Sequence, residues 1–147
     1  MLTHFFRFAL LAIALMIFAC GDDEQPRVCT EIGCTSGFTV RFDEPILLKG
    51  EQRLLIELDL SGSTRRCELR AGETPMVSEN CGAMTFHWDG KRLEEFIVHD
   101  ADPENVGVRV RRDQETLHQG EFALNYQEVQ PNGPGCPPIC RQALLQL

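Results

Sequence analysis

The chain has 147 residues, of which 14 are Lys or Arg and 22 are Asp or Glu, so its formal net charge at pH 7 is −8. This acidic balance argues against nucleic-acid binding, which needs a positively charged surface. It also argues against electrostatic binding of a polybasic segment to anionic lipid headgroups. The length suits one domain with a modest core, for which we expect no cofactor.

An apolar run opens the chain. Residues 8–19, "FALLAIALMIFA", follow a single basic residue, Arg7. A run of this length is typical of an export signal and is too short to span a bilayer as a helix. A buried core helix is the alternative, but the run lacks the polar face that such a helix normally shows. We therefore predict a signal peptide over residues 1–19.

The run ends at Cys20, which is followed by the polar residues "GDDE". The stretch from Ile17 to Cys20, "IFAC", resembles the lipobox of bacterial lipoproteins. The resemblance implies cleavage before Cys20, lipid on its sulfur and acyl chains such as palmitate, and hence an anchor in a bacterial envelope membrane, inner or outer. Residues 20–28 would be the lipidated cysteine and a tether, and 29–147 the folded domain. Ordinary secretion, with Cys20 as a spare thiol, is the alternative.

The chain has seven cysteines, and lipidation of Cys20 leaves six. An even set in an exported domain is typical of a disulfide framework. A bridge between Cys67 and Cys81 would close a hairpin-sized loop and is favoured, with a stabilisation of about 3 kcal/mol. The other four lie near the chain ends, at Cys29, Cys34, Cys136 and Cys140. We favour bridges between the two ends, because local bridges would close loops short enough to strain the disulfide geometry. Local bridges remain the competing interpretation.

Five segments alternate apolar and polar residues with period two. In 38–42, "FTVRF", the apolar residues Phe38, Val40 and Phe42 would share one face. Such alternation predicts half-buried antiparallel strands. The five segments are 38–42, 53–60, 84–89, 105–113 and 121–129, and weaker strands are expected at 65–70 and 93–98.

Seven or so short strands with a turn signal every 8–12 residues, for example at Asp89-Gly90 and Gln119-Gly120, predict an all-β fold. We expect a single antiparallel β-sandwich, immunoglobulin-like in the loose sense and stapled by disulfides. The Cys, Trp and Cys spacing of true immunoglobulin domains is absent, so the topology stays open. Only residues 140–147, "CRQALLQL", are considered for a short helix.

The segment 130–143, "QPNGPGCPPICRQA", mixes four prolines with glycines and two cysteines. It would be either a rigid binding loop or a structural feature that ends the last strand and presents the cysteines for bridging. Together with "VRVRRD" at 108–113, it resembles the C-terminal part of small cysteine-bearing lipoproteins of myxobacteria and their relatives. That resemblance implies a location and a fold but no activity.

Candidate catalytic residues are few. His87, His99 and His118 are the available bases, and the serines at 61, 63 and 78 are the available nucleophiles. None lies in a nucleophile-elbow or similar context, so a small envelope hydrolase using His87 or His99 is an alternative function only.

Two metal sites can be considered, and we predict neither. Asp100, Asp102 and Glu104 could hold Ca²⁺ weakly, as in a calcium-dependent adhesion module, but they lack the glycine and distant glutamate of an EF-hand loop. Cys136 and Cys140 have zinc-like spacing, but an oxidising compartment favours disulfides over thiolate ligands.

The sequence therefore favours a lipid-anchored, non-enzymatic binding or structural module of the cell envelope. Besides the membrane, its partner would be an envelope protein or a polysaccharide, captured for instance at an exposed sheet edge. The arginines of the polar faces would form cross-strand ion pairs with residues such as Glu57 and Asp59, each worth about 1 kcal/mol or less. These arginines are Arg41, Arg109, Arg111 and Arg112.

Overall fold

The computed structural model describes residues 29–72 and 81–147, and the predicted signal peptide and tether, with Cys20, lie outside these residues. The described chain is all β, as predicted, with no helix. No helix in this part of the chain is long and apolar enough to cross a membrane. The strands are β1 (Gly37–Leu47), β2 (Arg53–Asp59), β3 (Thr64–Arg70), β4 (Met84–Trp88), β5 (Arg92–His99), β6 (Asn105–Arg112), β7 (Glu115–Ala123), β8 (Gln127–Val129) and β9 (Cys140–Gln146).

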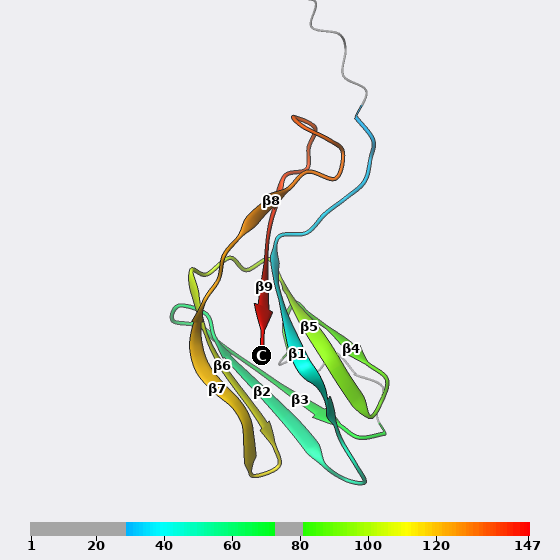
Figure 1. The fold of residues 1–147 in the computed structure, drawn as a ribbon, viewed down its shortest axis with the longest axis vertical. Coiled ribbons are helices and arrows are strands. Elements are labelled where there is room, and N and C mark those ends of the chain that lie inside the picture. The colour runs from blue at the N-terminus through cyan, green and yellow to red at the C-terminus, as the bar shows by residue number, and fades with distance from the viewer. Residues whose placement is uncertain (1–28, 73–80) are drawn as a thin grey trace, which may run out of the picture.

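The strands form two sheets that face each other as a β-sandwich (Figure 1). Sheet A has the order β4-β5-β1-β9-β8, and sheet B has the order β3-β2-β6-β7. Neighbouring strands are antiparallel with one exception, because β1 and β9 run parallel. The sandwich prediction is confirmed, and the parallel pair is the departure from a purely antiparallel arrangement.

The core lies between the sheets and is built from the apolar residues of the alternating segments. Phe38 and Val40 of β1 and Leu54 and Ile56 of β2 are each 1% exposed or less. Burying a side chain of this size stabilises the fold by roughly 1.5–3 kcal/mol. No polar or charged residue of the described chain is fully buried. All the polar chemistry of the domain is therefore on its outer faces, edges and loops.

Three local features differ from the sequence predictions. The segment 121–129 is not one strand, because the chain leaves sheet B after β7 and enters sheet A at β8. The predicted turn at Gln119-Gly120 lies within β7. The hairpin between β6 and β7 turns instead at 113–114, where Asp113 has a positive φ of 52°. The candidate helix at the C-terminal end is instead β9, whose Ala143 pairs with Phe38 and points into the core.

Three disulfides connect the six cysteines of the domain. Cys67 is bridged to Cys81, with 4.6 Å between their Cα atoms. The other two bridges join the two ends of the domain, as the favoured prediction had it. These bridges are Cys29 with Cys136 and Cys34 with Cys140, with Cα separations of 5.6 and 6.1 Å. Because Cys136 and Cys140 are both bridged, they are not available as zinc ligands.

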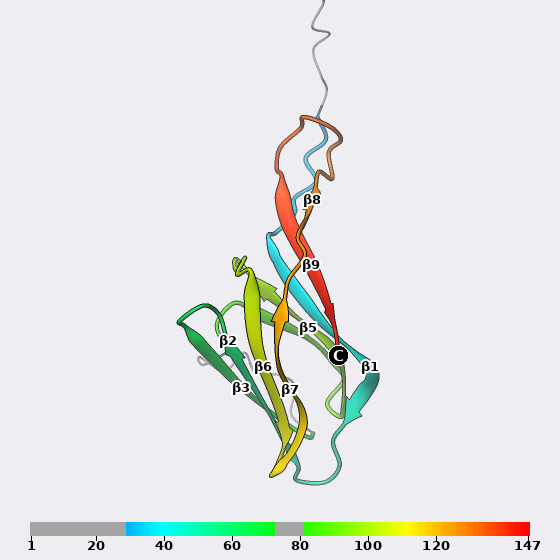
Figure 2. The same cartoon turned by 60° about the vertical axis from the view of Figure 1, so that its left-hand side comes forward.

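These two bridges hold together a projection that we call the neck, formed by residues 29–36 and 127–139. The neck extends beyond one end of the sandwich in both views (Figures 1 and 2). Within it, the Asn132 side chain accepts hydrogen bonds from Thr30 and from the Ile32 amide, and donates to the carbonyls of Ile32 and Pro137. The proline-rich segment therefore has a structural role, which is one of the two interpretations of its sequence.

Candidate functional site

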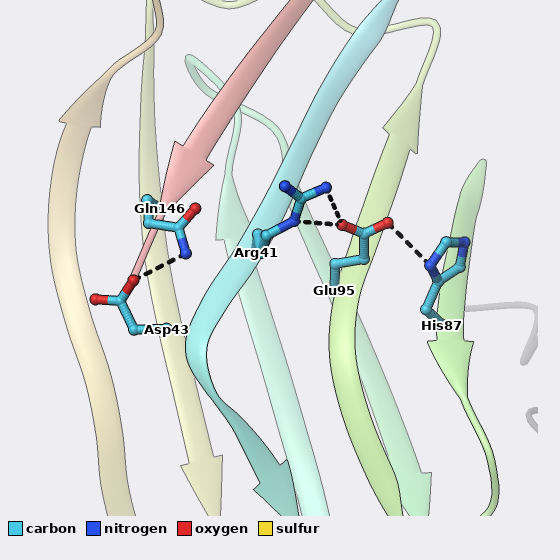
Figure 3. Close-up of polar contacts among 5 residues, drawn as sticks. All are labelled: Arg41, Asp43, His87, Glu95 and Gln146. Atoms are coloured by element: carbon cyan, nitrogen blue, oxygen red, sulfur yellow. Dashed lines mark hydrogen bonds and ion pairs between the residues drawn. The ribbon is translucent and has the colours of Figure 1, made fainter.

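A row of charged side chains crosses the outer face of sheet A (Figure 3). The strand register places Arg41 of β1 opposite Glu95 of β5, and Glu95 opposite His87 of β4. The Arg41 guanidinium lies 2.8 Å from Oε2 of Glu95, and Nδ1 of His87 lies 2.9 Å from Oε1. The Glu95 side chain is only 12% exposed, so its two partners cover it.

The same row continues onto β9. Gln146 lies opposite Arg41 in the parallel register and donates a hydrogen bond of 2.9 Å to Asp43 (Figure 3). The backbone reinforces this contact, because the Leu147 amide donates to the Arg41 carbonyl at 2.9 Å. The C-terminal strand is thereby fastened to the centre of sheet A.

The His87–Glu95 pair is the arrangement closest to a catalytic device in the described chain. A carboxylate on Nδ1 orients the ring, and the other ring nitrogen points away from Glu95 (Figure 3). However, no hydroxyl or thiol of the described residues is bonded to this imidazole, and the hollow of about 380 Å³ beside it is lined by charged and apolar residues without a Ser, Thr or Cys. Among the predicted nucleophiles, Ser61 and Ser63 lie in the connection between β2 and β3, and Ser78 lies outside the described residues.

His99 is in a different environment. Its Nε2 lies 2.9 Å from the hydroxyl of Thr85, its neighbour on the outer face of sheet A. This His–Thr pair lacks the carboxylate that orients the base of a catalytic triad. The structure therefore separates the two candidate histidines into two unrelated contacts.

A groove of about 760 Å³ lies beside His99, across β5, β1, β9 and β8. Its floor is apolar at Ile97 and Leu144, and Leu144 is 55% exposed. Amide and hydroxyl side chains supply its polar contacts, and the charged Arg41 stands at one end. The amide and hydroxyl residues are Thr35, Ser36, Thr39, Asn125, Gln127 and Gln142. The chemistry of this groove is that of a binding surface with uncharged hydrogen-bonding groups around an apolar strip.

Gly37 shapes the floor of the groove where β1 passes between β5 and β9. Its φ is 150°, and a Cβ added there would overlap the backbone oxygen of Val98. Only glycine allows β1 to approach β5 so closely at this point.

The acidic loop 100–104 does not form a calcium site in the structure. Asp102 pairs with Arg141 at 2.9 Å, and the Arg141 guanidinium lies 4.9 Å from the centre of the Tyr126 ring. In the described part of the chain, no three His, Cys, Asp or Glu residues converge in a way that could hold a metal ion. Burial, and next the negative charge of Asp102, raise the pKa of Tyr126, which Arg141 partly offsets.

The arginines of the polar faces form cross-strand ion pairs, as predicted. Arg41 pairs with Glu95 on β5, the neighbour of β1, because Glu57 lies in the other sheet. Arg112 pairs with Glu115 across the turn that follows β6. Arg109 and Arg111 do approach Glu57, each at 3.8 Å.

Sequence reasoning missed two residues that organise these surfaces, Glu95 and Asn132. Glu95 lies in a weakly patterned strand, and its alternation with Phe96 was the one signal that could have placed it on the outer face. Asn132 lies within the proline-rich segment, where no periodicity exists.

Comparison with known proteins adds no further assignment, because no family model, no curated protein and no solved structure matches this chain.

Proposed function

We propose that the protein is a lipid-anchored, non-enzymatic binding module of the bacterial cell envelope. The lipobox-like stretch ending at Cys20 supports the anchor, and the disulfides of the domain fit an oxidising compartment. The groove on the outer face of sheet A is the observation that supports binding.

The occupant that fits this groove is an extended peptide segment of an envelope protein. The amides of Asn125, Gln127 and Gln142 match the donors and acceptors of a peptide backbone, and the strip formed by Ile97 and Leu144 suits apolar side chains. The strand β8, which borders the groove, is an edge strand of sheet A and can pair with an added strand.

A polysaccharide fits the groove less well. Sugar rings offer apolar faces that stack on exposed aromatic rings, whereas the exposed large apolar residues of the described chain are all aliphatic: Ile32, Leu47, Ile139 and Leu144. The one Phe, Tyr or Trp among the groove residues is Phe38, which is 1% exposed.

The test of peptide binding is selection from a library of random linear peptides on the purified lipid-free domain. A charge placed on the groove floor by Leu144→Glu should abolish binding of the selected peptides. Leu47→Glu is the matched control, because Leu47 is similarly exposed, at 49% against 55%, but does not line the groove. Equal loss in both variants, or selection of no peptide, would contradict the proposal.

The test of the anchor is mass spectrometry of the protein isolated from its native envelope. We expect a chain that begins at Cys20 and has lipid on that residue, and a Cys20→Ser variant that is released from the membrane. A chain that keeps its first nineteen residues and has freely alkylatable thiols throughout would refute the anchored, disulfide-stapled form.

A small hydrolase that uses His87 is the second candidate, and the 2.9 Å contact between His87 and Glu95 is the observation that favours it. In that case His87 would act as a base toward a water molecule, because no nucleophilic side chain of the described residues contacts it. Hydrolysis of ester or amide substrates that is lost in His87→Gln but not in His99→Gln would support it. Absence of turnover in the wild-type protein would exclude it.

A further inference from the structure

The outer face of sheet B gathers five arginines from three neighbouring strands. We call this set the arginine face: Arg53 of β2, Arg66 and Arg70 of β3, and Arg109 and Arg111 of β6. Their side chains are between 35% and 63% exposed. The chain as a whole has a net charge of −8, so this face is a local reversal of its charge.

In the part of the chain that the structure describes, two carboxylates form the ion pairs of these arginines, and both are shared. Glu57 has three guanidiniums around it, those of Arg66, Arg109 and Arg111, at 4.0, 3.8 and 3.8 Å. Glu68 is shared by the two remaining arginines of the face, at 3.8 and 2.9 Å. The Glu57 side chain is 24% exposed, less than any of the arginines around it, so the outermost charges of the face are positive.

The hydrogen-bonding capacity of this cluster is not used up. Of the five ion pairs, only the one between Arg70 and Glu68 is short enough for a hydrogen bond. Oε2 of Glu57 and Nε of Arg111 are both buried and lack a hydrogen-bond partner within the described chain. In addition, Arg53 lies directly opposite Arg70 in the β2–β3 register, which sets two like charges side by side.

Fold stability does not account for such an arrangement. An exposed ion pair contributes about 1 kcal/mol or less, and like charges placed opposite each other on a sheet are destabilising. Five arginines share two carboxylates, so three of the positive charges add repulsion between guanidiniums without a carboxylate of their own. An anion bound over the face would relieve that repulsion and accept hydrogen bonds from the exposed parts of the guanidiniums.

We infer that the arginine face binds a linear acidic polysaccharide through its carboxylate groups. Guanidiniums bind carboxylates with paired, charge-assisted hydrogen bonds. On a sheet, neighbouring strands are about 4.8 Å apart and successive outward residues of a strand are about 7 Å apart, so the arginines form a flat lattice that an extended polyanion can cross. The negative residues Asp59 and Glu121 occupy the next row of the sheet and limit the lattice at that end.

A polymer fits this face better than a membrane surface does. None of the exposed large apolar residues of the described chain, which lie at 32, 47, 139 and 144, belongs to a strand of sheet B, so the face has no such side chain to insert among lipids. Attraction to anionic headgroups would therefore rest on charge alone, without the insertion of apolar side chains that strengthens binding at a membrane surface. Duplex DNA is another polyanion that guanidiniums attract, so the test compares it with the polymer.

The test is binding of the lipid-free domain to polygalacturonate at low salt, with neutral dextran as the control polymer. We expect binding to polygalacturonate alone, weakening as salt rises. Arg109→Gln should weaken the binding of polygalacturonate about fivefold, because the loss of one charged contact has about this effect. The matched control is Arg92→Gln in sheet A, since the two side chains are 51% and 49% exposed and each substitution removes one charge. Arg92→Gln should change the affinity by less than twofold.

Three outcomes would overturn the inference. The first is no binding of polygalacturonate by the wild-type domain, and the second is an equal loss in both variants, which would indicate a general charge effect. The third is tighter binding to vesicles containing anionic lipid, or to duplex DNA, than to the polymer. If Arg109→Gln fails to fold, Arg66→Gln on the edge strand β3, with a side chain 63% exposed, replaces it and has the same expected effect.

Discussion

The two bridges of the neck should stabilise the domain in a strongly non-additive way. Each one joins residues more than a hundred positions apart, with sequence separations of 107 and 106. When either bridge is already present, the other closes only a small ring, made of the six residues 29–34 and the five residues 136–140. In the chain-entropy account, closing the long loop contributes about 5 kcal/mol and closing the ring of about 11 residues contributes about 3 kcal/mol.

Removing one bridge therefore leaves the long loop closed. Replacing Cys29 and Cys136 by Ala, or Cys34 and Cys140 by Ala, should each lower the free energy of unfolding by about 3 kcal/mol. Removing both bridges should lower it by about 8 kcal/mol, which is more than the two single losses combined and comparable to the whole stability of a small domain. We expect the variant without either bridge to be marginally folded or unfolded.

Urea unfolding of the lipid-free domain, followed by tryptophan fluorescence, measures these differences, because Trp88 is the one tryptophan of the chain. Trp88 lies in β4 of the sandwich and not in the neck, so it reports on the domain itself. The pair Cys67 and Cys81, which closes a short loop, is the reference for an isolated bridge worth about 3 kcal/mol. A variant without either neck bridge that is as stable as a single-bridge variant would refute the reasoning, and so would a loss near 5 kcal/mol on removing one.

Three further predictions concern single residues. Gly37→Ala should destabilise the fold by more than about 2 kcal/mol in urea unfolding, whereas Gly33→Ala, with open space around it, should change little. Absorbance titration of Tyr126, the one tyrosine of the chain, should give a pKa above 10.0 that falls in Asp102→Asn. This raised pKa means that stability falls as pH rises from about 10. Backbone N–H groups lower the pKa of Asp89, so the stability difference between wild type and Asp89→Ala should be present at neutral pH and shrink below about pH 3.8.

The period-two alternation predicted most of the strands and the core because burial on one face of a sheet imposes that pattern directly. It failed at β9, where Leu144 is apolar but faces outward between the inward residues Ala143 and Leu145, so the alternation is blurred. It also missed the turn after β6, since glycine is the usual signal of a positive φ and this turn uses Asp113 instead.

The surfaces of the domain were less predictable than its core. The row of Arg41, Glu95 and His87 depends on which strands become neighbours, and Arg41 and Glu95 are 54 positions apart. Alternation shows that such a residue faces outward but not which sheet it belongs to. For that reason the sequence predicts an ion pair for Arg41 but does not identify Glu95 as its partner, and Glu57 lies in the opposite sheet.

The placement of the neck relates the two proposed binding surfaces to the proposed anchor. Cys29, the first described residue, lies in the neck, and the neck projects along the long axis of the molecule (Figures 1 and 2). If Cys20 is lipidated, the neck end is the one nearest the membrane, and the outer faces of sheets A and B look sideways in opposite directions. The buried core separates the groove of sheet A from the arginine face of sheet B. A peptide on one face and an acidic polymer on the other should therefore bind at the same time without altering each other's affinity.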